Sequence, residues 1–154
     1  MDYLNLVSNF DGKTIRLPFL LAPLGGITKL EARDYQLVLD TGADITALTE
    51  EFLKRSGYSK FQRTGTKKRT ATGETELYTC EINGMTIANQ FKIGKMKVDV
   101  LSGWDTHSVV GVIGMDILSK LTFILSHEYK KFMLSEQAVP ELSRLFEVNH
   151  AKTH

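Results

Sequence analysis

Three observations predict a mostly β domain with two or three short helices. Short apolar or alternating runs recur along the chain, separated by glycine, asparagine or charged residues, and runs of this length rarely complete a stable helix. Few segments carry the start and stop signals of a helix. The 154 residues, 42% hydrophobic and 24% charged, have the size and composition of one globular domain with a packed core.

The strands are expected at the recurring runs, which span residues 14–22, 35–40, 75–82, 85–93, 95–101 and 109–113. Asn83-Gly84 lies between two of them and predicts a tight hairpin, because a type I′ turn needs positive φ at both central positions. A second hairpin is expected between residues 121–126 and 131–135, around the polar turn 127–130.

Helix signals are clearest at residues 49–56. Acidic residues stand in the first turn, Lys54 and Arg55 in the last, and Gly57 follows, which suits the helix dipole and a glycine stop. A shorter helix is expected to start at Asp116, with its carboxylate accepting from the backbone of Ser119. A third is expected at residues 140–146, followed by a frayed tail at 147–154.

One loop carries the chemistry. Residues 37–44 read Leu-Val-Leu-Asp-Thr-Gly-Ala-Asp, so a buried strand delivers Asp40 into a glycine turn. Downstream, residues 109–118 read Val-Val-Gly-Val-Ile-Gly-Met-Asp-Ile-Leu. Between the two, residues 67–78 form polar extended arms around a Thr72-Gly73 tip. A carboxylate presented in this way is placed for acid and base catalysis.

In the order and spacing of these motifs the chain resembles the retropepsin family of aspartic peptidases, over roughly residues 14–135. The resemblance implies a closed β-barrel that corresponds to one half of an acid protease and carries a flap hairpin. This domain is expected at residues 1–135, followed by a C-terminal helix or tail at residues 136–154. Retroviral members carry arginine where this chain has Met115, and Gly114-Met115-Asp116 is similar to cellular and bacterial relatives.

The resemblance also implies roles for individual residues. Asp40 is expected to be the catalytic carboxylate, Thr41 to bond across a dimer axis, and Gly42 to let the substrate backbone approach. The residues expected to bind substrate are Ala43, Asp44, Thr72, Gly73, Val110, Val112 and Ile113.

The expected chemistry needs two aspartates, so the single Asp40 of each chain implies that two chains assemble. Hydrolysis without a metal or a nucleophilic side chain needs one carboxylate to deprotonate water and a protonated one to donate to the carbonyl. Two carboxyls about 3 Å apart share one proton, as in aspartic proteases. Because only one such loop is present, the second Asp40 is expected from the partner in a homodimer, with activity at mildly acidic pH.

Other function classes fit less well. The net charge of +1 gives no reason to expect nucleic acid or a membrane as partner. No cofactor or metal is expected, since His150 and His154 stand in a tail that should fray. The single Cys80, expected to be a buried thiol, favours a cytoplasmic location.

Two rival interpretations remain beside an endopeptidase acting on a peptide or protein substrate. A strand, aspartate and glycine turn also occurs in actin-like ATPases and phosphotransferases, but those folds need several alternating strand and helix units. The second keeps the fold without the activity and leaves a catalytically silent dimer that binds peptides.

Overall fold

The computed structural model describes residues 9–10, 13–24, 35–70, 73–103, 108–129 and 131–135, and the described part is mostly strand. The predictions for residues 136–154, including the helix at 140–146, lie outside these ranges. The elements are β1 (Asn9–Phe10), β2 (Ile15–Leu21), β3 (Gln36–Leu39), β4 (Ala47–Thr49), α1 (Glu50–Arg55), β5 (Phe61–Thr70), β6 (Gly73–Ile82), β7 (Met85–Ile87), β8 (Phe91–Ile93), β9 (Met96–Leu101), β10 (Val109–Ile113), α2 (Met115–Leu118), β11 (Thr122–Ser126) and β12 (Lys131–Ser135).

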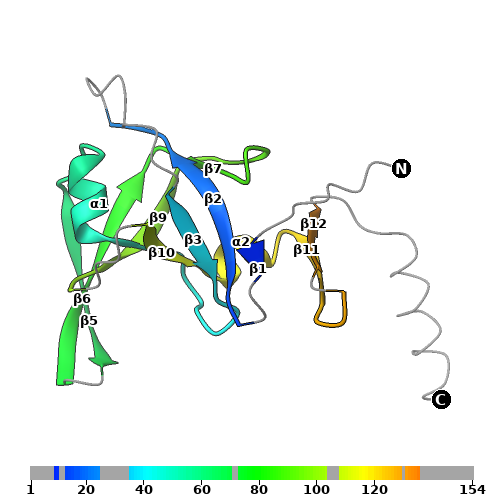
Figure 1. Ribbon diagram of the computed structural model, residues 1–154. Helices are drawn as coiled ribbons and strands as arrows, with labels where there is room; N and C mark the ends of the chain where they lie inside the picture. Colours follow the sequence, from blue (N-terminus) through cyan, green and yellow to red (C-terminus); the bar gives the residue numbers. More distant parts are fainter. Residues whose placement is uncertain are drawn as a thin grey trace, which may run out of the picture.

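Ten of the strands form one sheet. Its order is β5-β6-β9-β4-β10-β3-β2-β7-β8, with β1 paired to β2. The long β5–β6 hairpin projects from one end of the molecule, whereas β11 and β12 form a separate hairpin at the other end (Figure 1). The hairpin predicted at the end of the domain is therefore confirmed, with Thr122 opposite Ser135 and Ser126 opposite Lys131.

The core forms because strand side chains alternate between two faces. In β2, Leu17, Phe19 and Leu21 are buried, whereas the two residues between them are exposed. Helix α1 packs onto this layer through Phe52, whose ring centroid lies 5.5 Å from that of Phe19 and 4.8 Å from that of Tyr35. Burial of these aromatic rings stabilises the contact between helix and sheet.

The predicted closed barrel is wrong, because the sheet is open. Its end strands β5 and β8 do not pair with each other. Strand β8 has three residues, and the outer part of β5 carries the exposed side chains of Lys67, Lys68 and Arg69. Short strands and charged side chains are common ways of protecting a sheet edge from further pairing.

The hairpin predicted at Asn83-Gly84 is also wrong. Strand β6 pairs with β5 and β9, and β7 pairs with β2 and β8, so the two strands flanking this turn are not partners. The turn is held by other segments: the Asn83 N–H donates to the Tyr58 hydroxyl, and the Ala22 N–H donates to the Gly84 carbonyl. Gly84 has φ of 130°, and a Cβ there would lie 2.4 Å from the Ile93 carbonyl oxygen.

A tight hairpin forms a few residues later and divides the run at 85–93 into β7 and β8. Ala88 and Asn89 both have positive φ, 53° and 59°, as a type I′ turn requires. Asparagine tolerates this conformation, but alanine rarely adopts it. The Ala88-Asn89 dipeptide therefore gives little sequence signal for its turn.

The predicted first helix is confirmed. Thr49 is its N-cap and accepts from the Phe52 N–H, Lys54 pairs with Glu50, and Gly57 follows with φ of 89°. This arrangement provides partners for the unpaired backbone groups at both ends of the helix. No helix in the described ranges is long and apolar enough to cross a membrane.

Candidate functional site

The loop after β3 presents the Asp40 carboxylate at the surface. The Asp40 N–H donates to the Ile113 carbonyl at 3.0 Å, which continues the pairing of β3 with β10 beyond the end of β3. The chain then turns, with the Gly42 N–H donating to Asp40 Oδ1 at 2.9 Å and the Ala43 N–H to the Asp40 carbonyl at 3.2 Å. One carboxylate oxygen is thus oriented by a backbone amide while the side chain stays accessible to a reactant.

Gly42 contributes space as well as an amide. A Cβ at this position would lie 3.2 Å from Asp40 Oδ1, closer than carbon and oxygen atoms ordinarily approach. The glycine therefore keeps the carboxylate in contact with the turn. The neighbouring Thr41 is exposed, and its hydroxyl makes no hydrogen bond within the described part of this chain.

Backbone hydrogen bonds from the segment after β10 hold the Asp40 loop in place. Strand β10 lies between β3, to which it is parallel, and β4, to which it is antiparallel. The Met115 N–H donates to the Ala43 carbonyl at 2.8 Å, and the Asp116 N–H donates to the Asp44 carbonyl at 3.0 Å. Two motifs about 70 residues apart in the chain therefore form one rigid unit.

Asp116 is the centre of this unit. Its Oδ1 accepts from the Thr46 hydroxyl at 2.7 Å, from the Thr46 N–H at 3.0 Å and from the Ile117 N–H at 2.9 Å. The Thr46 hydroxyl oxygen in turn accepts from the Gly114 N–H at 3.1 Å. A carboxylate oxygen with three donors gives strong, charge-assisted hydrogen bonds.

The structure corrects the predicted role of Asp116 at the helix start. Helix α2 begins at Met115 with Gly114 as N-cap and no side-chain cap, and the Ser119 N–H donates to the Met115 carbonyl. Asp116 instead reaches across to Thr46. The sequence carried no signal for this contact because the partner lies 70 positions away.

Two substitutions at Asp116 distinguish the contribution of its hydrogen-bond acceptor to stability from that of its negative charge. Asp116→Asn keeps an Oδ1 acceptor but loses the charge assistance and should lower the free energy of unfolding by about 1 kcal/mol, whereas Asp116→Ala removes all three bonds and should cost about 3 kcal/mol. Urea unfolding of both variants measures the difference. Equal losses in the two would show that the charge, and not the acceptor, matters.

Asp44 is exposed, and its carboxylate makes no hydrogen bond or ion pair within the described residues. Its backbone carbonyl is held by Asp116, as described above. Met115 packs against the core. The Asp44 side chain is therefore available to a ligand, and its predicted substrate contact stays a prediction.

The remaining predicted site residues are divided between surface and core. Val112 is half-buried, whereas Val110 and Ile113 are 2% and 1% exposed and belong to the hydrophobic core. Gly73 begins β6 with φ of 134°. Thr72 lies outside the described residues, so its predicted contact stays untested.

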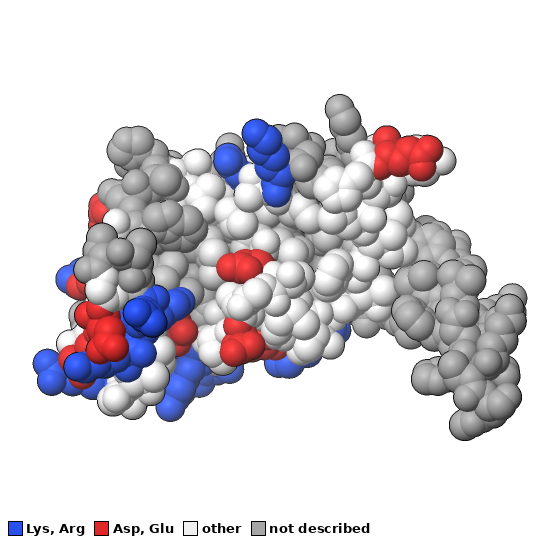
Figure 2. Space-filling view, turned by 90° about the horizontal axis from the view of Figure 1, so that it is seen from below, with Lys and Arg blue, Asp and Glu red and all other residues white. Residues whose placement is uncertain are grey.

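The predicted polar arms form a hairpin. Strands β5 and β6 pair from Phe61 opposite Cys80 to Thr70 opposite Gly73. Basic and acidic side chains gather together over it (Figure 2), and the ion pairs Arg63–Glu76 at 3.5 Å and Lys67–Glu74 at 3.8 Å join its strands. These exposed pairs contribute little stability, and they keep the surface of the hairpin polar.

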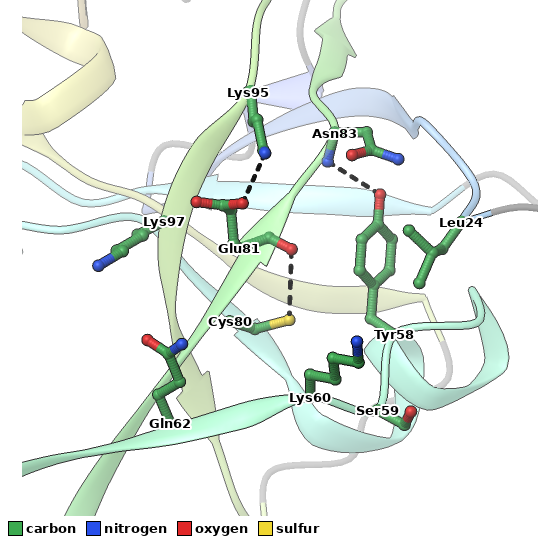
Figure 3. A pocket seen from close by; sticks show the side chains of 10 residues that line it. All are labelled: Leu24, Tyr58, Ser59, Lys60, Gln62, Cys80, Glu81, Asn83, Lys95 and Lys97. Atoms are coloured by element: carbon green, nitrogen blue, oxygen red, sulfur yellow. Dashed lines mark hydrogen bonds and ion pairs between the residues drawn. The ribbon is translucent and has the colours of Figure 1, made fainter.

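A hollow of about 400 Å³ lies away from the Asp40 loop, beside the base of this hairpin. Within it the Lys95 side chain points at Glu81, 2.7 Å away, and the Tyr58 hydroxyl meets the Asn83 N–H (Figure 3). Its wall includes Cys80, which is buried as predicted, and burial raises the pKa of this thiol. The lining residues are Leu24, Tyr58, Ser59, Lys60, Gln62, Cys80, Glu81, Asn83, Lys95 and Lys97.

Neither this hollow nor a second of about 250 Å³ beside β2 and β8 includes Asp40. The candidate site is thus an accessible loop on the described surface of a single chain. Within the same part of the chain, no three His, Cys, Asp or Glu side chains gather as metal ligands. The cytoplasmic location inferred from Cys80 stays a prediction.

Comparison with known proteins identifies a family model that matches this sequence and solved structures of similar fold. A family model described as gag-polyprotein putative aspartyl protease matches residues 28–120. A retropepsin-like aspartic protease from Rickettsia conorii superimposes with a TM-score of 0.60 at 20% identity, covering 87% of this chain and 98% of that one. No protein with a curated description matches the sequence.

Two further solved structures are more distant. The retroviral protease-like domain of Ddi1 from Leishmania major matches with a TM-score of 0.48 at 15% identity, covering 82% of this chain and 98% of that one. The EIAV protease in complex with an inhibitor matches with a TM-score of 0.40 at 20% identity, covering 69% and 84%. The likeness of fold rests on the Rickettsia structure.

Proposed function

The chain belongs to the family of gag-polyprotein putative aspartyl proteases, and we propose that it is an aspartic endopeptidase that works as a homodimer. The predicted retropepsin-like fold is confirmed by the family match and the Rickettsia structure. The observation that carries the proposal is the Asp40 carboxylate, exposed at the surface and held by the Gly42 N–H in a loop locked by Asp116.

The dimer follows from the chemistry. Each chain supplies one Asp40, and hydrolysis by water needs one ionised and one protonated carboxyl. An isologous interface brings the same loop of two chains together across a twofold axis. The exposed Thr41 hydroxyl, which has no bond within the described part of its own chain, is then free to bond with the partner.

In this dimer the two Asp40 carboxyls hold one proton between them. The ionised carboxylate takes a proton from water while the oxygen attacks the peptide carbonyl carbon, and the protonated carboxyl donates to the carbonyl oxygen. The resulting diol collapses when the carboxyl that took the proton from water donates it to the amide nitrogen, a diol hydroxyl gives its proton to the other carboxylate, and the C–N bond breaks, which leaves one proton shared by the pair. We assign the β5–β6 hairpin as the flap that closes over the substrate.

The proposal predicts that activity depends on dimer concentration. Below the dimer dissociation constant, cleavage of a fluorogenic peptide per mole of chain should fall in proportion to total protein, because two chains form each site. Sedimentation velocity over the same concentrations measures the dimer independently. Constant specific activity across a dilution in which the dimer dissociates would contradict a shared site, and a stable dimer without cleavage at any pH would favour the peptide-binding module.

A further inference from the structure

A row of neighbouring residues runs across the sheet from the Asp40 loop to the β5–β6 hairpin. The strand registers place Val38 beside Val112, Val112 beside Ala47, Ala47 beside Asp99, and Asp99 beside Thr79. Residues directly opposite one another on paired strands point to the same face. These five side chains therefore line one face of the sheet.

This face is directed away from the core. The adjacent row on β3, β4 and β9 consists of Leu37, Leu48 and Val100, which point to the opposite face and are buried. In the first row Ala47 is buried, and the other four residues are half-buried. Asp40 follows Val38 by two positions, so the alternation of side chains places it on the same side as this row.

Asp99 is the only acidic residue of the row, and its carboxylate is unmatched. It is half-buried, and its side chain makes no hydrogen bond or ion pair within the described part of the chain. Burial raises the pKa of Asp99 above its usual value, and nearby Asp116 adds to this, whereas Lys68 opposes it. A half-buried carboxylate without a partner destabilises a fold, and such groups occur often at functional sites.

Among the described residues, the one cation that influences Asp99 is distant. Lys68 lies on β5 opposite Thr75 and is exposed, and it does not approach within 4.0 Å of the Asp99 carboxylate. Its charge therefore acts at a distance and leaves the carboxylate oxygens without a donor. A lysine or arginine side chain of a ligand lying along this face would supply one.

The position of Asp99 fits a peptide that crosses the site. Three strand spacings separate Val38 from Asp99, or roughly 14 Å, the length of about four residues of extended chain. We propose that Asp99 is a specificity-determining residue that selects a lysine or arginine within about four positions of the cleaved bond. This inference rests on the proposed function, since it names the substrate class of the same site.

The test compares cleavage of a set of peptides by wild type and by Asp99→Asn. Each of the four positions on either side of the cleaved bond is varied in turn and carries lysine, glutamine or glutamate. Wild type should prefer lysine to glutamine at one position by about 10-fold in kcat/KM. Asp99→Asn should lose this preference and cleave the glutamine peptide as wild type does. Glu51→Gln, which neutralises an exposed carboxylate of α1, is the control and should keep the preference.

A second measurement separates this inference from the proposed function. Calorimetry with Asp40→Asn, alone and combined with Asp99→Asn, measures peptide binding without cleavage. Binding of the lysine peptide about 10-fold tighter than the glutamine peptide, lost on Asp99→Asn, supports the inference even if wild type cleaves nothing. Cleavage with no preference for a basic residue, or a preference that Asp99→Asn leaves unchanged, would overturn it.

A purely structural role for Asp99 predicts a different pattern. Loss of a structural carboxylate would lower the melting temperature and reduce cleavage of all peptides alike. Removal of an unmatched half-buried charge should instead leave the Tm of Asp99→Asn equal to that of wild type or higher. A lower Tm with equal losses on lysine and glutamine peptides would contradict the proposal.

Discussion

Replacement of Asp40 by asparagine should reduce peptide cleavage by about 10³-fold or more, because it removes the group that takes the proton from water. The fold should survive, since an asparagine Oδ1 still accepts from the Gly42 N–H. Steady-state kinetics on one peptide measure the loss in kcat. Circular dichroism and sedimentation confirm that the variant is folded and dimeric.

Asp44→Asn is the matched control. Asp44 lies four residues further along the same exposed loop, and its carboxylate makes no contact within the described part of the chain. If Asp40 acts through its chemistry and not through the charge of the loop, Asp44→Asn should show any loss of its predicted substrate contact in KM and should lose less than about 10-fold in kcat. Equal losses in the two variants would mean that cleavage depends on loop charge alone.

Replacement of Gly111 by alanine should have the largest effect on stability. A Cβ at Gly111 would lie 2.1 Å from the Ala47 carbonyl oxygen and 3.0 and 3.1 Å from side-chain atoms of Leu48 and Leu37. The closest of these atoms belongs to the backbone of the paired strand β4, so the clash cannot be relieved by a rotamer change. We expect a cost of about 3 kcal/mol or more in the free energy of unfolding.

Gly94→Ala tests whether this cost arises from the close approach. A Cβ at Gly94 has no heavy atom within 4 Å, and its φ is outside the left-handed region. Urea unfolding should place this variant within about 0.5 kcal/mol of wild type. Failure of Gly111→Ala to accumulate as folded protein agrees with the account, whereas wild-type stability of Gly111→Ala would refute the packing of β10 against β4.

Local signals predicted much of this structure. The Asp40 loop, the strand at 109–113 and helix α1 lie where the sequence places them, because glycine turns, apolar runs and helix caps depend on neighbouring residues. The Gly111 and Gly114 positions of the second motif are explained by close backbone contacts with β4 and with Ile45. Sequence spacing indicated these glycines without showing what they touch.

Features set by pairing between distant segments could not be predicted. Asn83-Gly84 is a strong hairpin signal, yet β7 pairs with β2 because hydrophobic partners there outweigh the local turn preference. The open sheet, the reach of Asp116 to Thr46 and the placement of Asp99 in line with Val38 all depend on register. Register is a property of the whole sheet.

The central claim is that two Asp40 carboxylates from two chains form one site, and mixing subunits tests it most directly. A fixed amount of wild type is equilibrated with increasing Asp40→Asn, at a wild-type concentration that already forms dimers, and peptide cleavage is followed. If both carboxylates are needed, heterodimers are inactive, and activity should fall toward zero as the variant reaches about 10-fold excess. Wild-type activity that is unchanged at that excess, with subunit exchange verified by a tagged variant, would contradict the shared site.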